Sequence, residues 1–426
     1  MVAGRAVVGA AVGAASFATP LYVAELAPAR HRGSLVTLNV LCVTLGQVAA
    51  YVAGWGLVGV RDGWRWMVGL GAVPAVLQGV LLLAFMPETP RWLVKAGRPV
   101  AARRVIQKTV VSSTGKERVG GGGGGEEDPV SVRLVNRILK DIETEVREEE
   151  VERRRMTAAA VANDNGAATT SRKSSGGGEW VKGWRELLAV PRNRRALTIA
   201  CLLQGLQQLC GFNSLMYFSA TIFTILGFST PTLTSLSVAA TNFIFTVAAL
   251  LVIDRIGRRR ILLYSVPFMV VGLVLSAIGF RFFFFEPPAD GGQSGETAAE
   301  IVNGEASSSS LSSRNSAAII LVSIMVYVAA YALGLGNVPW MQSELFPLSV
   351  RSLGSGAATC VNWTANFAVG LTFLPMMDVL TPTWTFALYA VVCVAGWVAI
   401  WLIYPETSGL TLEEATGLLE DGWGVR

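Results

Sequence analysis

The sequence predicts an all-helical membrane protein, and three of its features carry that prediction. Of the 426 residues, 52% are hydrophobic and 15% are charged, whereas soluble domains carry roughly 25% charged residues. The apolar residues gather in nine runs, each close to the roughly 20 residues that cross a bilayer as a helix. Lys and Arg cluster after alternate runs, which is typical of loops on the cytoplasmic side.

Each run is expected to form a helix, because a backbone amide inside lipid must find its partner within the same segment. The first run contains Arg5 and ends in a charged turn, so it does not have the pattern of a cleaved signal peptide. The basic residues place the ends of the odd-numbered runs, and the C-terminus, in the cytoplasm. The runs cover residues 1–24, 34–58, 65–86, 195–218, 232–253, 260–283, 316–340, 352–376 and 383–404.

Two hydrophilic stretches interrupt the runs. The first, 93–193, contains six consecutive glycines at 120–125 and is expected to be a cytoplasmic loop with flexible parts. Within it, apolar residues recur at helical spacing and predict one amphipathic helix. These residues are Val132, Val135, Ile138, Leu139 and Ile142. The second stretch, 286–314, is rich in Ser and Gly and is expected to be an irregular external loop.

A repeat relates the two ends of the chain. ELAPARHR (25–32) and ELFPLSVR (344–351) share the spacing of Glu, Pro and Arg, and PET occurs at 87–89 and again at 405–407. Runs one to three therefore look like a copy of runs seven to nine, as in transporters built from two similar halves. Runs four to six have no copy, which predicts six-helix halves and three further helices ahead of residue 1. The expected parts are 1–92 (half of a bundle), 93–193 (loop), 194–410 (a six-helix bundle) and 411–426 (tail).

Seven motifs carry a resemblance to a known family. They are GRAVVGAAVGAASFATPLYVAELAPARHRG (4–33), PETPRWL (87–93), QQLCGFNSLMYFS (207–219), DRIGRR (254–259), GLGNVPWMQSELFP (334–347), NWTANF (362–367) and PETSG (405–409). In this order they resemble the sugar porters of the major facilitator superfamily, which implies the major facilitator fold. Asn39–Val40, Gly46–Gln47 and Asn337 resemble the fungal myo-inositol transporters within that family.

A neutral polyol needs a site of amides, which both donate and accept hydrogen bonds, with aromatic rings alongside. The runs supply such side chains, although amides in membranes also serve as contacts between helices. The resemblance implies that substrate contacts Gln207, Gln208, Asn213, Asn242, Trp340 and Asn362. Further candidates from the same chemistry are Asn39, Gln47 and Asn337.

Charged residues suggest two further roles. Arg5 lies within a span, where a charge is costly and usually functional. The resemblance implies that Arg5 takes part in proton coupling. The alternative is that its side chain extends to the outer membrane surface and has no such role. Acids and bases at the cytoplasmic ends of the runs are expected to form a gate that holds the two halves together, although the arginines also fit simple topology signals. The gate residues are Glu25, Arg32, Glu88, Arg91, Asp254, Arg258, Arg259, Glu344, Arg351 and Glu406.

The resemblance implies a secondary transporter that moves a polyol, myo-inositol, across the membrane by alternating access together with protons. The five cysteines lie in apolar runs without metal-ligand spacing, so no metal, no cofactor and no enzymatic reaction are expected. A hexose or another polyol is the alternative substrate, and a receptor-like or inactive chain is the alternative class. The lipid bilayer is the expected partner, and the plasma membrane, rather than the vacuole, is the expected location.

Overall fold

The computed structural model describes residues 2–27, 32–114, 132–144, 146–147, 151, 177–226, 228, 230–285, 305–347, 349–410, 412–420 and 422–425, and these contain helices and no strand. The long helices are α1 (Val2–Leu26), α2 (Arg32–Leu57), α9 (Pro191–Leu209), α10 (Phe212–Ile225), α11 (Pro231–Ile256), α12 (Arg258–Phe285), α13 (Glu305–Leu333), α14 (Arg351–Val379) and α15 (Thr381–Ile403). The shorter ones are α3 (Gly63–Leu70), α4 (Ala72–Phe85), α5 (Pro90–Lys95), α6 (Pro99–Thr114), α8 (Gly177–Ala189), the 3-10 helix η2 (Val338–Leu345) and α16 (Leu412–Gly417).

Seven segments of the described residues are long and apolar enough to cross a membrane. The predicted runs 195–218 and 352–376 are helical but are not among these seven. Side-chain amides lower the hydropathy of both, including Gln207 and Gln208 in one and Asn362 in the other, and the first is also divided between α9 and α10. The predicted total of nine spans, and the three helices expected before residue 1, therefore stay predictions.

Three of the predicted runs are divided between helices, and the simplest case is run 65–86, which is split at Gly71 into α3 and α4. Gly211 separates α9 from α10 at a left-handed φ of 86°, a conformation that glycine adopts without steric cost. A Cβ at Gly211 would lie 3.0 Å from the ring of Tyr389. α13 ends at Leu333, and η2 follows with Pro339 near its start, so the run is interrupted at GLGNVPW.

The start of α13 corrects one expectation. The stretch 286–314 was expected to be irregular, but α13 begins at Glu305, so that expectation is wrong for 305–314; residues 286–304 lie outside the described part. No Gly or Pro occurs between Glu305 and Gly334. Serine is only a moderately poor helix former, so the helix extends through the serine-rich segment.

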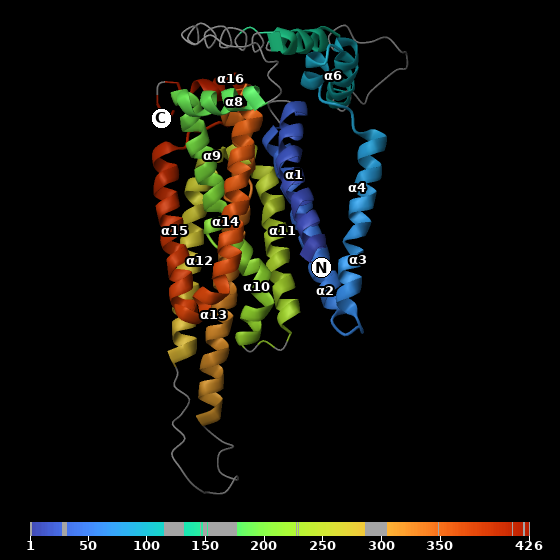
Figure 1. Cartoon of the computed structure of the whole chain (residues 1–426). Coiled ribbons are helices and arrows are strands. Elements are labelled where there is room, and N and C mark those ends of the chain that lie inside the picture. The colour runs from blue at the N-terminus through green and yellow to red at the C-terminus, as the bar shows by residue number, and fades with distance from the viewer. Residues whose placement is uncertain are drawn as a thin grey trace. The chain divides into compact units, whose positions relative to one another are not determined.

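Packing divides the chain into two compact units, and the larger comprises 1–20, 29–67 and 186–426. In this unit α12 packs against α13 and α15, α14 against α9, and α11 against α2 (Figure 1). Gly272 and Gly279 let α13 approach α12 closely, since a Cβ on either would lie within 3 Å of α13. After α16, the backbone carbonyls of Leu419 and Glu420 accept hydrogen bonds from Arg195 of α9.

The smaller unit comprises 21–28 and 68–185. α5 begins at Pro90, and the hydroxyl of Thr89 caps it by accepting from the Trp92 amide at 3.3 Å. Residues 132–144 form the helix that the apolar spacing predicted. Its residues Val135, Ile138, Leu139 and Ile142 pack around Ile106 of α6.

Candidate functional site

A cluster of side-chain amides lies where α9, α10 and α14 meet. Gln208 is at its centre: its Nε2 donates to Asn362 Oδ1 at 3.1 Å, and its Oε1 accepts from Asn213 at 2.6 Å and from Asn366 at 2.9 Å. Asn362 in turn donates to Gln207 Oε1 at 2.8 Å. We call these five residues the amide cluster. Gln207, Gln208 and Asn362 are at most 5% exposed, so the cluster is an uncharged polar patch inside an apolar bundle.

The outer members of the amide cluster keep free hydrogen-bonding capacity. Asn213 and Asn366 are half-buried, and their Oδ1 atoms accept no hydrogen bond from the described residues. An amide with an open carbonyl and a partly exposed edge can meet a hydroxyl. These two residues are therefore the members best placed to contact a ligand, while Gln207, Gln208 and Asn362 hold them in position.

The break after α13 is fixed by glutamines of α9. Gln207 Nε2 donates to the carbonyls of Leu335 and Gly336 at 3.1 and 3.0 Å. Gln204 Nε2 donates to the carbonyl of Pro339 at 3.1 Å. Buried carbonyls freed by a helix break must find partners, and these glutamines supply them, so the amide cluster and the broken segment are one connected arrangement.

A second polar contact joins α2 to α11. Asn242, 3% exposed, donates to Oε1 of Gln47 at 3.1 Å. Tyr51, one turn further along α2, donates to the carbonyl of Met216 at 2.6 Å. Two predicted site residues are therefore brought together here, although no hydrogen bond among the described residues connects them to the amide cluster.

The remaining predicted substrate residues lie apart from the cluster. Asn337 is fully buried and donates to the carbonyl of Ala332 at 2.5 Å, so its amide caps the end of α13. Trp340 is half-buried in η2. Asn39 is half-buried on α2, and its side chain forms no hydrogen bond with the described residues. Their role as substrate contacts stays a prediction.

Arg5 is exposed on α1, and its side chain contacts no acid among the described residues. Further along α1, Ser16 accepts a hydrogen bond from the indole of Trp363 at 2.9 Å. This bond ties α1 to α14 one residue from Asn362. The proposed coupling role of Arg5 stays a prediction.

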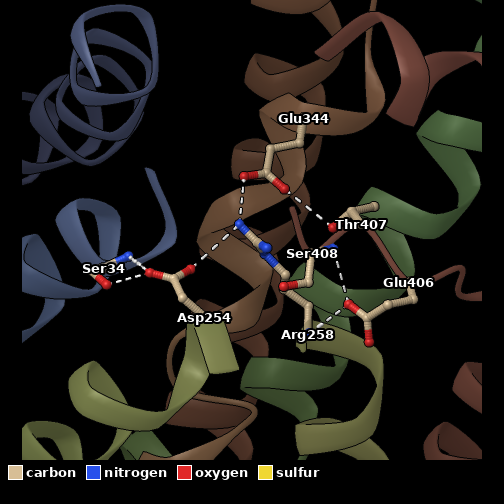
Figure 2. A network of polar contacts seen from close by, with 7 residues as sticks. All are labelled: Ser34, Asp254, Arg258, Glu344, Glu406, Thr407 and Ser408. Carbon is tan, nitrogen blue, oxygen red and sulfur yellow. Dashed lines mark hydrogen bonds and ion pairs between the residues drawn. The ribbon is translucent and has the colours of Figure 1, made fainter. Parts of the chain in front are cut away.

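Four of the predicted gate residues form one network, which Figure 2 shows from close by. Arg258, 3% exposed, lies 3.2 Å from Glu344 and 3.8 Å from Asp254. Glu406 accepts from the backbone amides of Arg258 and Arg259 at 2.8 and 3.1 Å. We call Asp254, Arg258, Glu344 and Glu406 the charge network.

The carboxylates of the charge network also cap helices. Glu406 binds the first amides of α12, and Asp254 accepts from the amide of Ser34 at 2.9 Å, near the start of α2, and from its hydroxyl (Figure 2). The first amides of a helix lack partners within the helix and carry partial positive charge. Asp254 therefore joins α2 to the helices that carry Arg258 and Glu344.

Tyr404 and Thr407 adjoin the charge network. Thr407 donates to Glu344 Oε2 at 3.2 Å. Burial, and then the carboxylates of Glu344 and Glu406, raise the pKa of the Tyr404 phenol, so this phenol stays neutral and adds no negative charge to the three carboxylates around Arg258.

The other predicted gate residues divide between the two units. Arg351 donates to the carbonyl of Phe346 at 3.1 Å, so it braces the segment between η2 and α14. Glu25, Glu88 and Arg91 belong to the smaller unit, and the side chain of Arg32 lies outside the described ones. For Glu25, Glu88, Arg91 and Arg32, the expected part in a gate that holds the two halves together stays a prediction.

Three residues of the site were not predicted. Asn366 follows Asn362 by four residues, about one helical turn, in the motif NWTANF. This spacing could have predicted that both amides lie on the same face of the helix. Gln204 precedes Gln207 and Gln208 by one turn in the same way. Ser34 gave no signal, because its role depends on where the start of α2 meets Asp254.

The chain is similar to known transporters. The family described as "Sugar (and other) transporter" matches residues 1–120 and 138–419. "Myo-inositol transporter 1" of Cryptococcus neoformans is 40% identical over all of this chain and 65% of its own length, and that of Candida albicans is 38% identical over 67% of its length. The chain thus spans about two thirds of the length of these curated relatives. The solved proton:xylose symporter XylE, bound to 6-bromo-6-deoxy-D-glucose, is 25% identical with a TM-score of 0.65, over 95% of this chain and 71% of XylE.

Proposed function

Because the chain belongs to the sugar transporter family of integral, multi-pass membrane proteins, we propose that it carries a neutral polyol, myo-inositol, across the plasma membrane by alternating access. The amide cluster is the observation that carries this proposal. Its buried groups are uncharged and both donate and accept, which suits a ring with hydroxyls all round it. The names of the relatives at 40% and 38% identity support myo-inositol as that polyol.

Protons are the proposed coupling ion. The support is the solved structure of similar fold, which is that of a proton:xylose symporter. Arg5 is the proposed modulator of coupling, since it is a charge within an apolar span.

The charge network is the proposed cytoplasmic gate. Asp254 links Ser34 of α2 to Arg258 of α12, and Arg258 contacts Glu344 of η2. A transporter that works by alternating access must break such links each time it opens inward. The proposal therefore assigns the described arrangement to the state in which this end is closed.

Uptake of labelled myo-inositol tests the proposal. Cells that lack their own inositol transporter would express the chain, and uptake of inositol and of glucose would be compared at acidic and neutral external pH. We expect saturable uptake of inositol that is faster at acidic than at neutral external pH and faster than the uptake of glucose. A preference for glucose would make glucose the proposed substrate in place of myo-inositol. Transport of neither compound, by a chain shown to be present at the cell surface, would overturn the proposal.

A further inference from the structure

Gln342 is a buried amide that neither the amide cluster nor the charge network uses. It lies in η2, two residues after Trp340 and two before Glu344, and is 6% exposed. Its Nε2 donates weakly to the carbonyl of Ser355 at 3.3 Å and to the hydroxyl of Thr359 at 3.4 Å, both on α14. These contacts hold η2 against α14 but leave the other half of the amide unexplained.

Two polar atoms beside these contacts have no partner among the described residues. They are Oε1 of Gln342 and the hydroxyl oxygen of Ser355, which is 4% exposed. Buried polar atoms are nearly always hydrogen-bonded, and one without a partner calls for an explanation such as a bound molecule. An amide that merely attached η2 to α14 would not need to leave its own acceptor open next to a residue whose hydroxyl is also open.

The open atoms define the chemistry of a ligand. Oε1 of Gln342 needs a donor, and the Ser355 hydroxyl can donate or accept. A group that does both while uncharged is a hydroxyl. No group of three or more His, Cys, Asp or Glu side chains suited to a metal occurs among the described residues.

The position of Gln342 connects it to the amide cluster. In a 3-10 helix residues three apart lie on one face, so Gln342 shares a face with Pro339, whose carbonyl accepts from Gln204. On α14, polar residues recur at helical spacing along one side: Ser355, Thr359, Asn362 and Asn366. Ser355 lies seven residues before Asn362, about 10 Å along the helix axis, and toward the charge network.

We propose that Gln342, Ser355 and Thr359 form a second hydroxyl-binding station for the polyol, between the amide cluster and the cytoplasmic gate. This inference rests on the proposed function. A hydroxyl of the departing substrate donates to Gln342 Oε1 and accepts from Ser355, so the polyol exchanges hydrogen bonds of the amide cluster for those of the station. The station then strengthens binding of polyol that enters from the cytoplasmic side and contributes little to binding of polyol that enters from outside.

The test compares the two directions of transport. Uptake would be measured from graded external myo-inositol, and efflux from cells preloaded with graded internal myo-inositol, for the unsubstituted chain and for Gln342→Met, which keeps the length of the side chain and removes the amide. We expect KM for efflux to rise about tenfold, the effect of losing about one well-made hydrogen bond, while KM for uptake changes less than about twofold. The maximal efflux rate should rise by a similar factor, because efflux and uptake must balance at equilibrium.

Further variants separate the possible outcomes. Ser355→Ala must show the same one-sided change, which keeps the test valid if Gln342→Met does not reach the membrane. Thr385→Val, which removes a buried hydroxyl bonded to Met376 at the other end of α14, should leave both KM values unchanged. Unchanged KM in both directions, an equal rise in both, or slower transport without a change in KM would each overturn the station and leave the open atoms to water or to packing. If the unsubstituted chain carries no inositol, the proposed function fails and the station fails with it.

Discussion

Gln208 shows at the scale of one residue how a neutral site can be built inside a membrane protein. Its three amide contacts reach α10 and two successive turns of α14. Because each amide holds the next, the donors and acceptors of the proposed substrate site are fixed before a ligand arrives, which reduces the entropy lost on binding.

Gln208→Ala tests this role. The change removes the common partner of Asn213, Asn362 and Asn366, and we expect kcat/KM for myo-inositol uptake to fall by at least about tenfold. Gln78→Ala removes an exposed amide from the apolar helix α4 and should leave uptake unchanged. Uptake by Gln208→Ala at the level of the unsubstituted chain, at equal surface expression, would count against the amide cluster as the substrate site.

Arg258 makes a separate prediction about stability. Its guanidinium is 3% exposed and its near partner is Glu344, so Glu344→Ala leaves a buried charge poorly paired. We expect this change to lower the free energy of unfolding by about 3 kcal/mol or more, measured as a fall in the apparent melting temperature of the purified protein in detergent.

Arg65 provides the matched comparison. It lies 3.1 Å from Asp62, but both side chains are well exposed, and exposed ion pairs contribute about 0–1 kcal/mol. Arg65→Gln should therefore change the melting temperature little. Similar losses for Arg65→Gln and Glu344→Ala would show that burial does not strengthen the Arg258 contact.

The sequence could identify these residue types but not all of their partners. Gln207, Gln208, Asn213 and Asn362 were predicted from the motifs that carry the family resemblance, and they stay predicted substrate contacts. Asn337 occupies the same kind of position, yet its amide caps the end of α13. Whether an amide faces a ligand or its own backbone depends on the path of the broken helix, which spacing along the chain does not specify.

At the scale of helices, the start of α12 shows how a residue far along the chain shapes an element. Gly257 has φ of 98°, and a Cβ there would lie 2.5 Å from Oε2 of Glu406. The glycine thus gives the carboxylate access to the first amides of α12, which it caps.

Gly257→Ala is therefore expected to displace Glu406 and to lower stability by more than strain alone. Gly97 is the control, because it also has positive φ, 73°, but nothing lies within 4 Å of its Cβ position. Gly97→Ala should cost about 1–2 kcal/mol, the usual cost of a left-handed alanine. Thermal melts of the two variants decide the matter, and equal shifts would contradict a specific role for the Glu406 cap.

Helix positions were more predictable than helix breaks. Every predicted apolar run forms one or two helices, because lipid requires backbone hydrogen bonds to close locally. The break at Gly211 was missed, since a glycine within an apolar run is equally compatible with a straight helix. Because Gly211 has no Cβ, the ring of Tyr389 can pack closely against it, and that contact comes from a residue far along the chain.

At the scale of the larger unit, α2 connects to the later helices at two levels. Near its start the amide of Ser34 bonds to Asp254, and further along Gln47 accepts from Asn242 and Tyr51 bonds to Met216. If the chain works by alternating access, the first level should open separately from the second. The contact between Ser34 and Asp254 is then a link whose loss shifts the population of states.

Thr37 offers a way to see that shift. It lies one turn after Ser34 on α2 and is 0% exposed, so a cysteine at this position (Thr37→Cys) should react slowly with a membrane-impermeant maleimide applied to the cytoplasmic face of inside-out vesicles. Adding Asp254→Ala removes the acceptor for Ser34 and one neighbour of Arg258. We expect labelling to become about tenfold faster, as for a state whose population rises from about 1% to about 10%. The native cysteines set the background, measured with Thr37 intact. Unchanged labelling in the double variant would mean that Asp254 does not hold this end closed, and the gate would then rest on Arg258 and Glu344 alone.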